Sequence, residues 1–166
     1  MGLDMYLNVS ERISSHDFHR VDNVTSYTES PRYNNVIAAA GVKVKDNIAS
    51  SVSVEYTAIY WRKSNQIHNW FVSYLADGVD ECQRIPVSRD DLVKLYNTCN
   101  VLLETRSNEL AADLLPPASG FFFGSIEIDE WYWQDIEETH KKLTELLDEI
   151  TEENKWNYNI EYQASW

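Results

Sequence analysis

The chain has 166 residues, with 14 Lys and Arg against 27 Asp and Glu, and its formal net charge at pH 7 is −13. A protein this acidic repels polyanions instead of releasing their counterions, which argues against generic DNA or RNA binding. Two interpretations of the acidity remain open: a charge that only keeps the protein in solution, or an acidic surface that occupies a basic partner.

Length and cysteine content favour one domain in a reducing compartment. A chain of this length buries most of its apolar surface without disulfides or a structural metal, so we expect a single domain over residues 1–166. Neither Cys82 nor Cys99 has the spacing of a disulfide framework or a metal site. No apolar run reaches the ~18–20 residues that span a bilayer. We therefore expect a cytoplasmic protein with no cofactor, no metal and no membrane partner.

The first third of the chain predicts strands around a polar segment. Residues 3–9 alternate apolar and polar side chains, which is typical of a strand with one buried face. Residues 10–35 are polar and predict a loop excursion from the domain. Strands follow over residues 36–44 and 52–60, which are rich in β-branched side chains, and residues 46–47 between them predict a turn.

The rest of the chain predicts three helices and two further strands. We expect helices over residues 62–75, 89–104 and 132–151, and strands over residues 126–128 and 156–166. Ser88 and Asp91 have the spacing of a capping box at the start of the second helix. Helices clustered between strands at both ends predict an α+β fold, a single domain with a mainly antiparallel sheet and about three helices packed on one face.

The first of these helices combines an apolar stripe with an unusual polar face. At 3.6 residues per turn, Ile67, Trp70 and Phe71 form the stripe, and we expect all three to be buried. The neighbouring face carries Trp61, Asn65 and His68. This combination of rings, an amide and an imidazole predicts a binding site on that face.

The polar residues of this helix each have two open interpretations. One interpretation of His68 is a general base whose tautomer is fixed by a nearby amide. The other is a histidine tied into a buried hydrogen-bond network. One interpretation of Arg62 and Lys63 is that they hold a phosphate or a carboxylate. The other is that they are only solvated, because cations at a helix start oppose the helix dipole. In either case we expect both cations to stay accessible to solvent.

A second unusual segment places three rings between two glycines. One interpretation of this segment is a wall on which a planar ligand stacks, formed by Phe121, Phe122 and Phe123; the other is that these rings pack into the core. Asp129 has two interpretations as well: its carboxylate accepts a hydrogen bond from a ribose hydroxyl, or it caps the third helix. The predicted ligand-binding residues are Trp61, Arg62, Lys63, Asn65, His68, Phe121, Phe122, Phe123 and Asp129.

Five motifs support a family resemblance. They are Met-Gly-Leu-Asp-Met-Tyr-Leu at 1–7, Tyr-Trp-Arg-Lys-x-Asn-x-Ile-His-x-Trp-Phe-Val at 60–72, Asp-Gly-Val-Asp-Glu-Cys at 77–82, Val-Ser-Arg at 87–89 and Ser-Gly-Phe-Phe-Phe-Gly at 119–124. With these motifs the chain resembles a widespread set of small uncharacterised proteins of bacteriophages and prophages. The resemblance covers most of the chain apart from about 10–55 and the C-terminal strand. It implies a protein that acts in the host cytoplasm during infection.

Three functions are compatible with these features. The leading hypothesis is a phage-encoded protein that binds a host nucleotide-type immune signal and sequesters it. The sequence contains no glycine-rich phosphate loop, nucleophile elbow or His-Glu-x-x-His motif, which favours binding over catalysis. The alternatives are a small nucleotide-processing enzyme with His68 as general base, and an acidic inhibitor whose helix near 135–152 binds a basic host factor. Homo-oligomer formation stays open.

Overall fold

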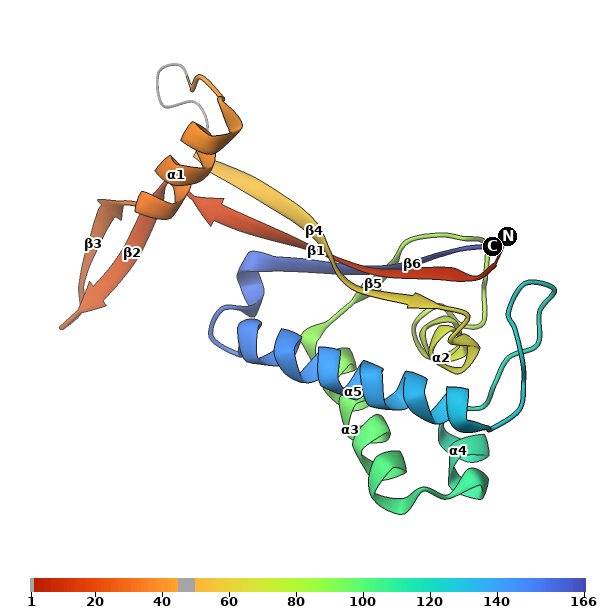
Figure 1. The fold of residues 1–166 in the computed structure, drawn as a ribbon. Helices are drawn as coiled ribbons and strands as arrows, with labels where there is room; N and C mark the ends of the chain where they lie inside the picture. The colour runs from red at the N-terminus through yellow and green to blue at the C-terminus, as the bar shows by residue number, and fades with distance from the viewer. Residues whose placement is uncertain (1, 45–49) are drawn as a thin grey trace. The chain divides into compact units, whose positions relative to one another are not determined.

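The computed structural model describes residues 2–44 and 50–166 of the chain. The elements in chain order are β1 (Asp4–Ser14), β2 (His16–Val21), β3 (Val24–Glu29), α1 (Pro31–Ala40), β4 (Ser51–Arg62), α2 (Asn65–Leu75), β5 (Ile85–Val87), α3 (Arg89–Thr105), α4 (Asn108–Leu114), α5 (Glu130–Glu149), the short 3₁₀ helix η1 (Lys155–Asn157) and β6 (Tyr158–Ser165) (Figure 1). The turn predicted at residues 46–47 lies outside the described residues.

Internal contacts divide the chain into two compact units. The first unit comprises Met1–Val9 and Tyr56–Trp166, and the second comprises Ser10–Glu55. The long strands β1 and β4 each have residues in both units. Among the described residues, no helix combines the length and the apolarity needed to cross a membrane.

The first unit is built on a four-stranded antiparallel sheet in the order β4-β1-β6-β5. Helices α2, α3, α4 and α5 lie on one side of this sheet (Figure 1). The edge strand β5 pairs antiparallel with β6, with Ile85 opposite Tyr162 and Val87 opposite Ile160. The α+β class and the mainly antiparallel sheet are therefore as predicted, although the described residues form five α-helices where about three were expected.

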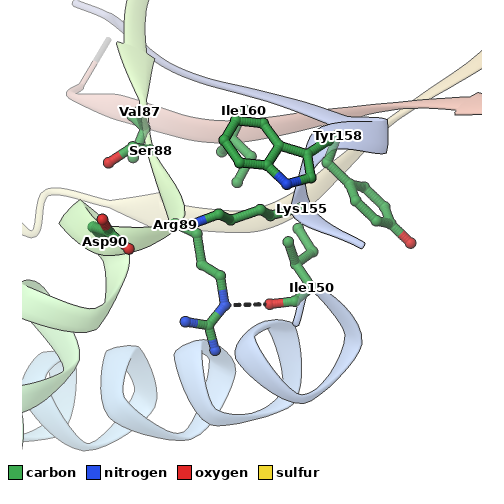
Figure 2. A pocket seen from close by; sticks show the side chains of 9 residues that line it. Val87, Ser88, Arg89, Asp90, Ile150, Lys155, Tyr158 and Ile160 are labelled. Carbon is green, nitrogen blue, oxygen red and sulfur yellow. Dashed lines mark hydrogen bonds between the residues drawn. The ribbon is translucent and has the colours of Figure 1, made fainter. Parts of the chain in front are cut away.

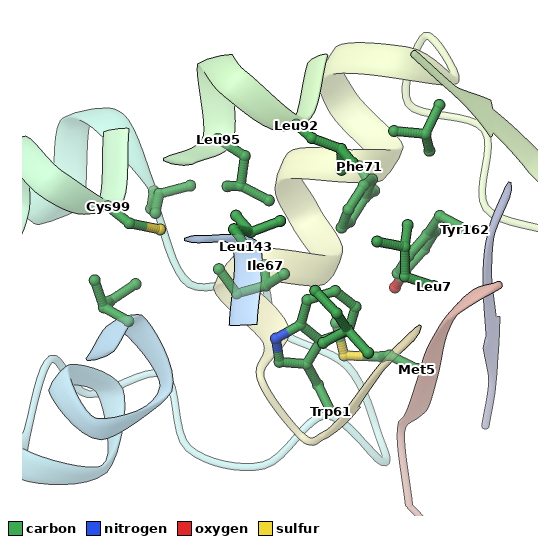
Figure 3. Packing of buried hydrophobic residues seen from close by; sticks show 14 of the residues in the cluster. Met5, Leu7, Trp61, Ile67, Phe71, Leu92, Leu95, Cys99, Leu143 and Tyr162 are labelled. Atoms are coloured by element: carbon green, nitrogen blue, oxygen red, sulfur yellow. The ribbon is translucent and has the colours of Figure 1, made fainter. Parts of the chain in front are cut away.

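Alternating burial along β1 explains how the sheet faces its helices. Met5 and Leu7 are fully buried, whereas Tyr6 between them is half-buried, because successive side chains of a strand point to opposite faces. Figure 3 shows how these side chains meet Phe71 of α2 and Tyr162 of β6. The Phe71 and Tyr162 rings stack with centroids 4.0 Å apart. Helix α3 packs along α5 and closes the core with Leu95.

The second unit corrects two predictions. The polar segment 10–35, expected to be a loop excursion, instead continues β1 to Ser14, forms the β2–β3 hairpin and enters α1. Residues 36–44 were predicted to form a strand, but α1 extends to Ala40. Pro31 occupies the first turn and Gly41 ends the helix in the left-handed conformation, with φ of 64°. The proline at the helix start, the glycine at its end and the three alanines between them favour a helix more strongly than the β-branched residues of this segment favour a strand.

Two predicted elements of the first unit also differ. Helix α2 begins at Asn65, not near residue 62, because β4 continues through Arg62 and Lys63 adopts a left-handed conformation with φ of 61°. Its Ile67 and Phe71 are buried as expected, but Trp70 is only half-buried. Residues 126–128, predicted to form a strand, belong to the irregular loop between α4 and α5.

Candidate functional site

A cavity of about 480 Å³ lies in the first unit. The end of β4, the start of α2, the loop joining α4 to α5 and the first turns of α5 all contribute to its walls. We call it the Lys63 pocket. Four of the nine predicted ligand-binding residues line it, namely Arg62, Lys63, Asn65 and Asp129.

Two cations form one side of the Lys63 pocket. Arg62 is 61% exposed at its side chain, and its Nε lies 4.0 Å from the Asp4 carboxylate, so the guanidinium is only loosely paired. Lys63 is also exposed, as predicted for both residues. The lysine stem passes the loop at Gly124, where a Cβ would lie 3.5 Å from Lys63 Cβ, and the φ of 92° at this glycine suits no other residue. The pocket thus offers two charged groups that can contact an anion.

The wall of the pocket also includes a half-buried acid, Asp135. Gln66 Nε2 donates a hydrogen bond of 3.1 Å to Asp135 Oδ2. Burial raises the pKa of the Asp135 carboxyl above its ordinary value of 3.8, and hydrogen bonds from Gln66 and Ser64 partly oppose this shift. Asp135 therefore keeps its proton to a higher pH than an exposed aspartate does.

The raised pKa of Asp135 predicts a specific pH dependence of stability. Between pH 3.8 and the raised pKa, the folded state binds more protons than the unfolded state, so the free energy of unfolding should fall as pH rises through this window. Asp135→Asn removes the titration and should flatten this part of the profile. Urea unfolding of both proteins across the window checks this. A wild-type contribution that grows with pH would contradict the assignment.

Asn65 was predicted to contact the ligand, but its side chain holds the loop between α4 and α5. Its Nδ2 donates to the carbonyl oxygens of Phe123, at 3.1 Å, and Ser125, at 2.8 Å. Its Oδ1 accepts from the backbone N–H of Ala118 at 3.1 Å. Both amide protons and the carbonyl oxygen are thus engaged with the protein, so Asn65 shapes the pocket wall.

His68 lies in a buried hydrogen-bond network, the second of its two interpretations. The ring is 2% exposed, with Nδ1 at 2.7 Å from the Tyr162 hydroxyl and Nε2 at 3.0 Å from Asp80 Oδ2. A neutral imidazole satisfies both contacts when Nε2–H donates to Asp80 and Nδ1 accepts the hydroxyl proton. Burial, with a further contribution from Asp80, raises the pKa of Tyr162 and keeps its hydroxyl protonated. Neither ring nitrogen is left to act as a base.

The aromatic residues of the predicted site lie in different surroundings, although the Phe121 and Phe122 rings contact each other with centroids 4.8 Å apart. Trp61 belongs to β4, not to α2, and its buried ring donates through Nε1 to Thr139 at 2.8 Å. Phe123 is buried against the edge of the His68 ring, with centroids 5.0 Å apart. Phe122 is half-buried and Phe121 is 95% exposed. Phe123 contacts His68, but none of these four rings lines the Lys63 pocket, so that pocket does not bring together all nine predicted residues.

Asp129 both caps α5 and lines the pocket. Its carboxylate accepts hydrogen bonds from the backbone N–H groups of Trp131, at 3.0 Å, and Tyr132, at 3.2 Å.

The sequence prediction missed Trp131, which lines the pocket and is 75% exposed, and it assigned Asp135 to the acidic helix near 135–152 that would bind a partner. A signal existed: Asp135 follows Trp131 by four positions, which puts both on one helix face. Gln66 was missed because only the tertiary fold brings it to Asp135.

A second cavity, of about 360 Å³, lies at the start of α3 beside the segment that joins α5 to β6 (Figure 2). Its cations are already engaged. Arg89 donates through Nε to the Ile150 carbonyl at 2.6 Å, and Nη1 pairs with Glu152 at 2.7 Å. Lys155 pairs with the same Glu152 at 2.8 Å. Arg89 thus stabilises the end of α5, and the Lys63 pocket has the more available charges.

Cys82 and Cys99 are free thiols, and burial raises the pKa of Cys99 to about 12, so its thiol stays protonated. Within residues 2–44 and 50–166, no group of three or more His, Cys, Asp or Glu side chains is placed to hold a metal ion.

A comparison of the chain with models of protein families, with curated proteins and with solved structures found no match.

Proposed function

We propose that the Lys63 pocket binds a nucleotide-like ligand and holds it without turnover. The observation that carries the proposal is the meeting of two exposed cations, Arg62 and Lys63, with the accessible ring of Trp131 in one cavity. In the cell this chemistry would let a phage protein withdraw a host nucleotide-type immune signal, which is the leading hypothesis from the sequence.

The charges of the pocket restrict the class of ligand. Two cations share the cavity with the carboxylates of Glu127, Asp129 and Asp135, so bare phosphate gains little net attraction. A nucleotide fits better because its phosphate contacts the cations while its hydroxyl and amino groups donate to carboxylates. Asp129 is already balanced by the first N–H groups of α5.

Binding without turnover is favoured by the state of His68. Its two ring nitrogens are engaged with Tyr162 and Asp80, and the ring lies in the core. The alternative of an acidic helix that binds a basic partner has less support, because two glutamates of that helix form ion pairs within the protein. Glu137 pairs with Arg106, and Glu138 pairs with Lys142.

Arg62→Ala should weaken nucleotide binding about ten- to hundredfold, because it removes a charge-assisted contact worth roughly 1.5–3 kcal/mol. Arg12→Ala is the matched control: it removes the same charge from an exposed site that does not line the pocket. Titration calorimetry with nucleoside mono-, di- and cyclic phosphates measures both variants. Equal losses in the two would show that binding depends on overall charge alone and would contradict the proposed site.

The fate of the ligand separates the remaining functions. After titration, the protein is denatured by heat and the released ligand is identified by mass spectrometry. Intact nucleotide supports sequestration. Recovered product would instead favour a nucleotide-processing enzyme, with Asp135 as the candidate acid or base. Absence of heat with every nucleotide would reject the pocket proposal and favour an acidic protein-binding inhibitor.

A further inference from the structure

The Lys63 pocket contains opposite charges that do not pair with each other. Over residues 2–44 and 50–166, neither Arg62 nor Lys63 forms an ion pair with a carboxylate of the pocket, and Arg62 instead lies 4.0 Å from Asp4. The carboxylates of the pocket belong to Glu127, Asp129 and Asp135. A ligand that contacts both sets of charges needs an anionic group at one end and hydrogen-bond donors at the other.

Asp135 is the carboxylate of this pocket that is best held in position to accept from such donors. Gln66 Nε2 donates to its Oδ2 at 3.1 Å, and the Ser64 side chain donates a further hydrogen bond. An ionised carboxylate accepts about four hydrogen bonds, so this one has capacity left for two donors of a ligand. Asp129 is instead engaged with the first N–H groups of α5, and Glu127 is exposed on the loop before that helix.

Trp131 supplies an accessible ring one turn of α5 before Asp135. The two residues are four positions apart in this helix, so they share one of its faces, and both line the Lys63 pocket. The indole is 75% exposed, and an exposed aromatic face is a surface on which a nucleobase stacks. A base that stacks on Trp131 therefore lies within one helical turn of the Asp135 carboxylate.

We propose that the Lys63 pocket selects guanine nucleotides, with Asp135 accepting hydrogen bonds from N1–H and the 2-amino group of the base. This inference rests on the proposed function, because it names the base of the nucleotide that the pocket binds. Guanine places two donors side by side, which matches the two oxygens of a carboxylate. Adenine and cytosine place an acceptor nitrogen beside their amino group, and uracil flanks its one N–H with two carbonyls. Each of these bases would turn an acceptor toward the carboxylate, which disfavours its binding.

Titration calorimetry with the monophosphates of guanosine, inosine and adenosine tests the choice of base. The wild-type protein should bind the guanosine nucleotide about ten- to hundredfold more tightly than the adenosine nucleotide. The inosine nucleotide should fall between them, because it keeps N1–H but lacks the 2-amino group. Equal affinity for guanosine and adenosine nucleotides would overturn the guanine inference and leave the proposed function standing. Absence of binding to all three would overturn both.

Asp135→Asn tests the residue that reads the base. An amide offers one acceptor and one donor, which match N1–H and the 2-carbonyl of xanthine, so this variant should bind guanosine monophosphate about tenfold more weakly and xanthosine monophosphate more tightly than wild type. A gain of xanthosine binding cannot arise from unfolding. Glu127→Gln is the matched control: it removes the same charge from the same pocket and should keep the wild-type order of bases. An unchanged order in Asp135→Asn, or a lost preference in Glu127→Gln, would overturn Asp135 as the guanine contact.

Discussion

Replacing His68 with alanine should lower the free energy of unfolding by about 3–5 kcal/mol. The substitution opens a void in the core and removes the partner of both the Tyr162 hydroxyl and the Asp80 carboxylate. It also removes ring contacts to Phe123 and Trp166, whose centroids lie 5.0 Å and 5.6 Å from that of His68. Urea unfolding followed by circular dichroism measures the loss.

Two further variants separate the hydrogen bond from the packing. Tyr162→Phe keeps the stacked ring but leaves His68 Nδ1 without its donor, and it should cost about 1–3 kcal/mol. His16→Ala changes an exposed histidine and should stay within about 0.5 kcal/mol of wild type. If His68→Ala were as stable as His16→Ala, the histidine would not be part of the folded network.

Asn65→Ala should free the loop between α4 and α5 and cost about 2–4 kcal/mol, because it breaks three hydrogen bonds to backbone groups. The loop forms a wall of the Lys63 pocket, so binding to that pocket should weaken as well. Hydrogen exchange measured by mass spectrometry should show faster exchange in peptides that cover residues 117–129. Unchanged exchange there would contradict the role of Asn65 as a clamp.

Asn69→Ala provides the matched control for this clamp. Asn69 lies one turn further along α2 and makes one exposed hydrogen bond of 3.0 Å to the same loop, at the Pro116 carbonyl. We expect it to cost less than about 1 kcal/mol. Similar losses in both variants would show that general damage to α2, and not the buried amide, explains the effect of Asn65→Ala.

The elements predicted well are those with local signals or one buried face. Helix α3 begins at the capping box of Ser88 and Asp91, which the structure confirms. Strands β1 and β6 were found because their alternating side chains match one buried and one open face. The β2–β3 hairpin was missed for the same reason: both of its faces are exposed, so the sequence shows no alternation there.

The candidate site was harder to predict because its residues are brought together by tertiary contacts. Left-handed Lys63 and the N-cap residue Ser64 separate β4 from α2, and this turn places Trp61 on a strand and not on the helix. His68 meets a tyrosine 94 positions away in the sequence, which no local pattern indicates. Arg62 and Lys63 were predicted correctly as accessible cations because exposure of a cation needs no tertiary partner.

The position of β6 in the sheet determines when the first unit can fold during synthesis. β6 lies between β1 and β5, although it follows both in the chain. Until the ribosome has released residues 158–165, β1 lacks one neighbour, and Phe71 lacks the ring of Tyr162. A nascent chain without this strand exposes an open sheet edge and apolar surface, which are the features that chaperones bind.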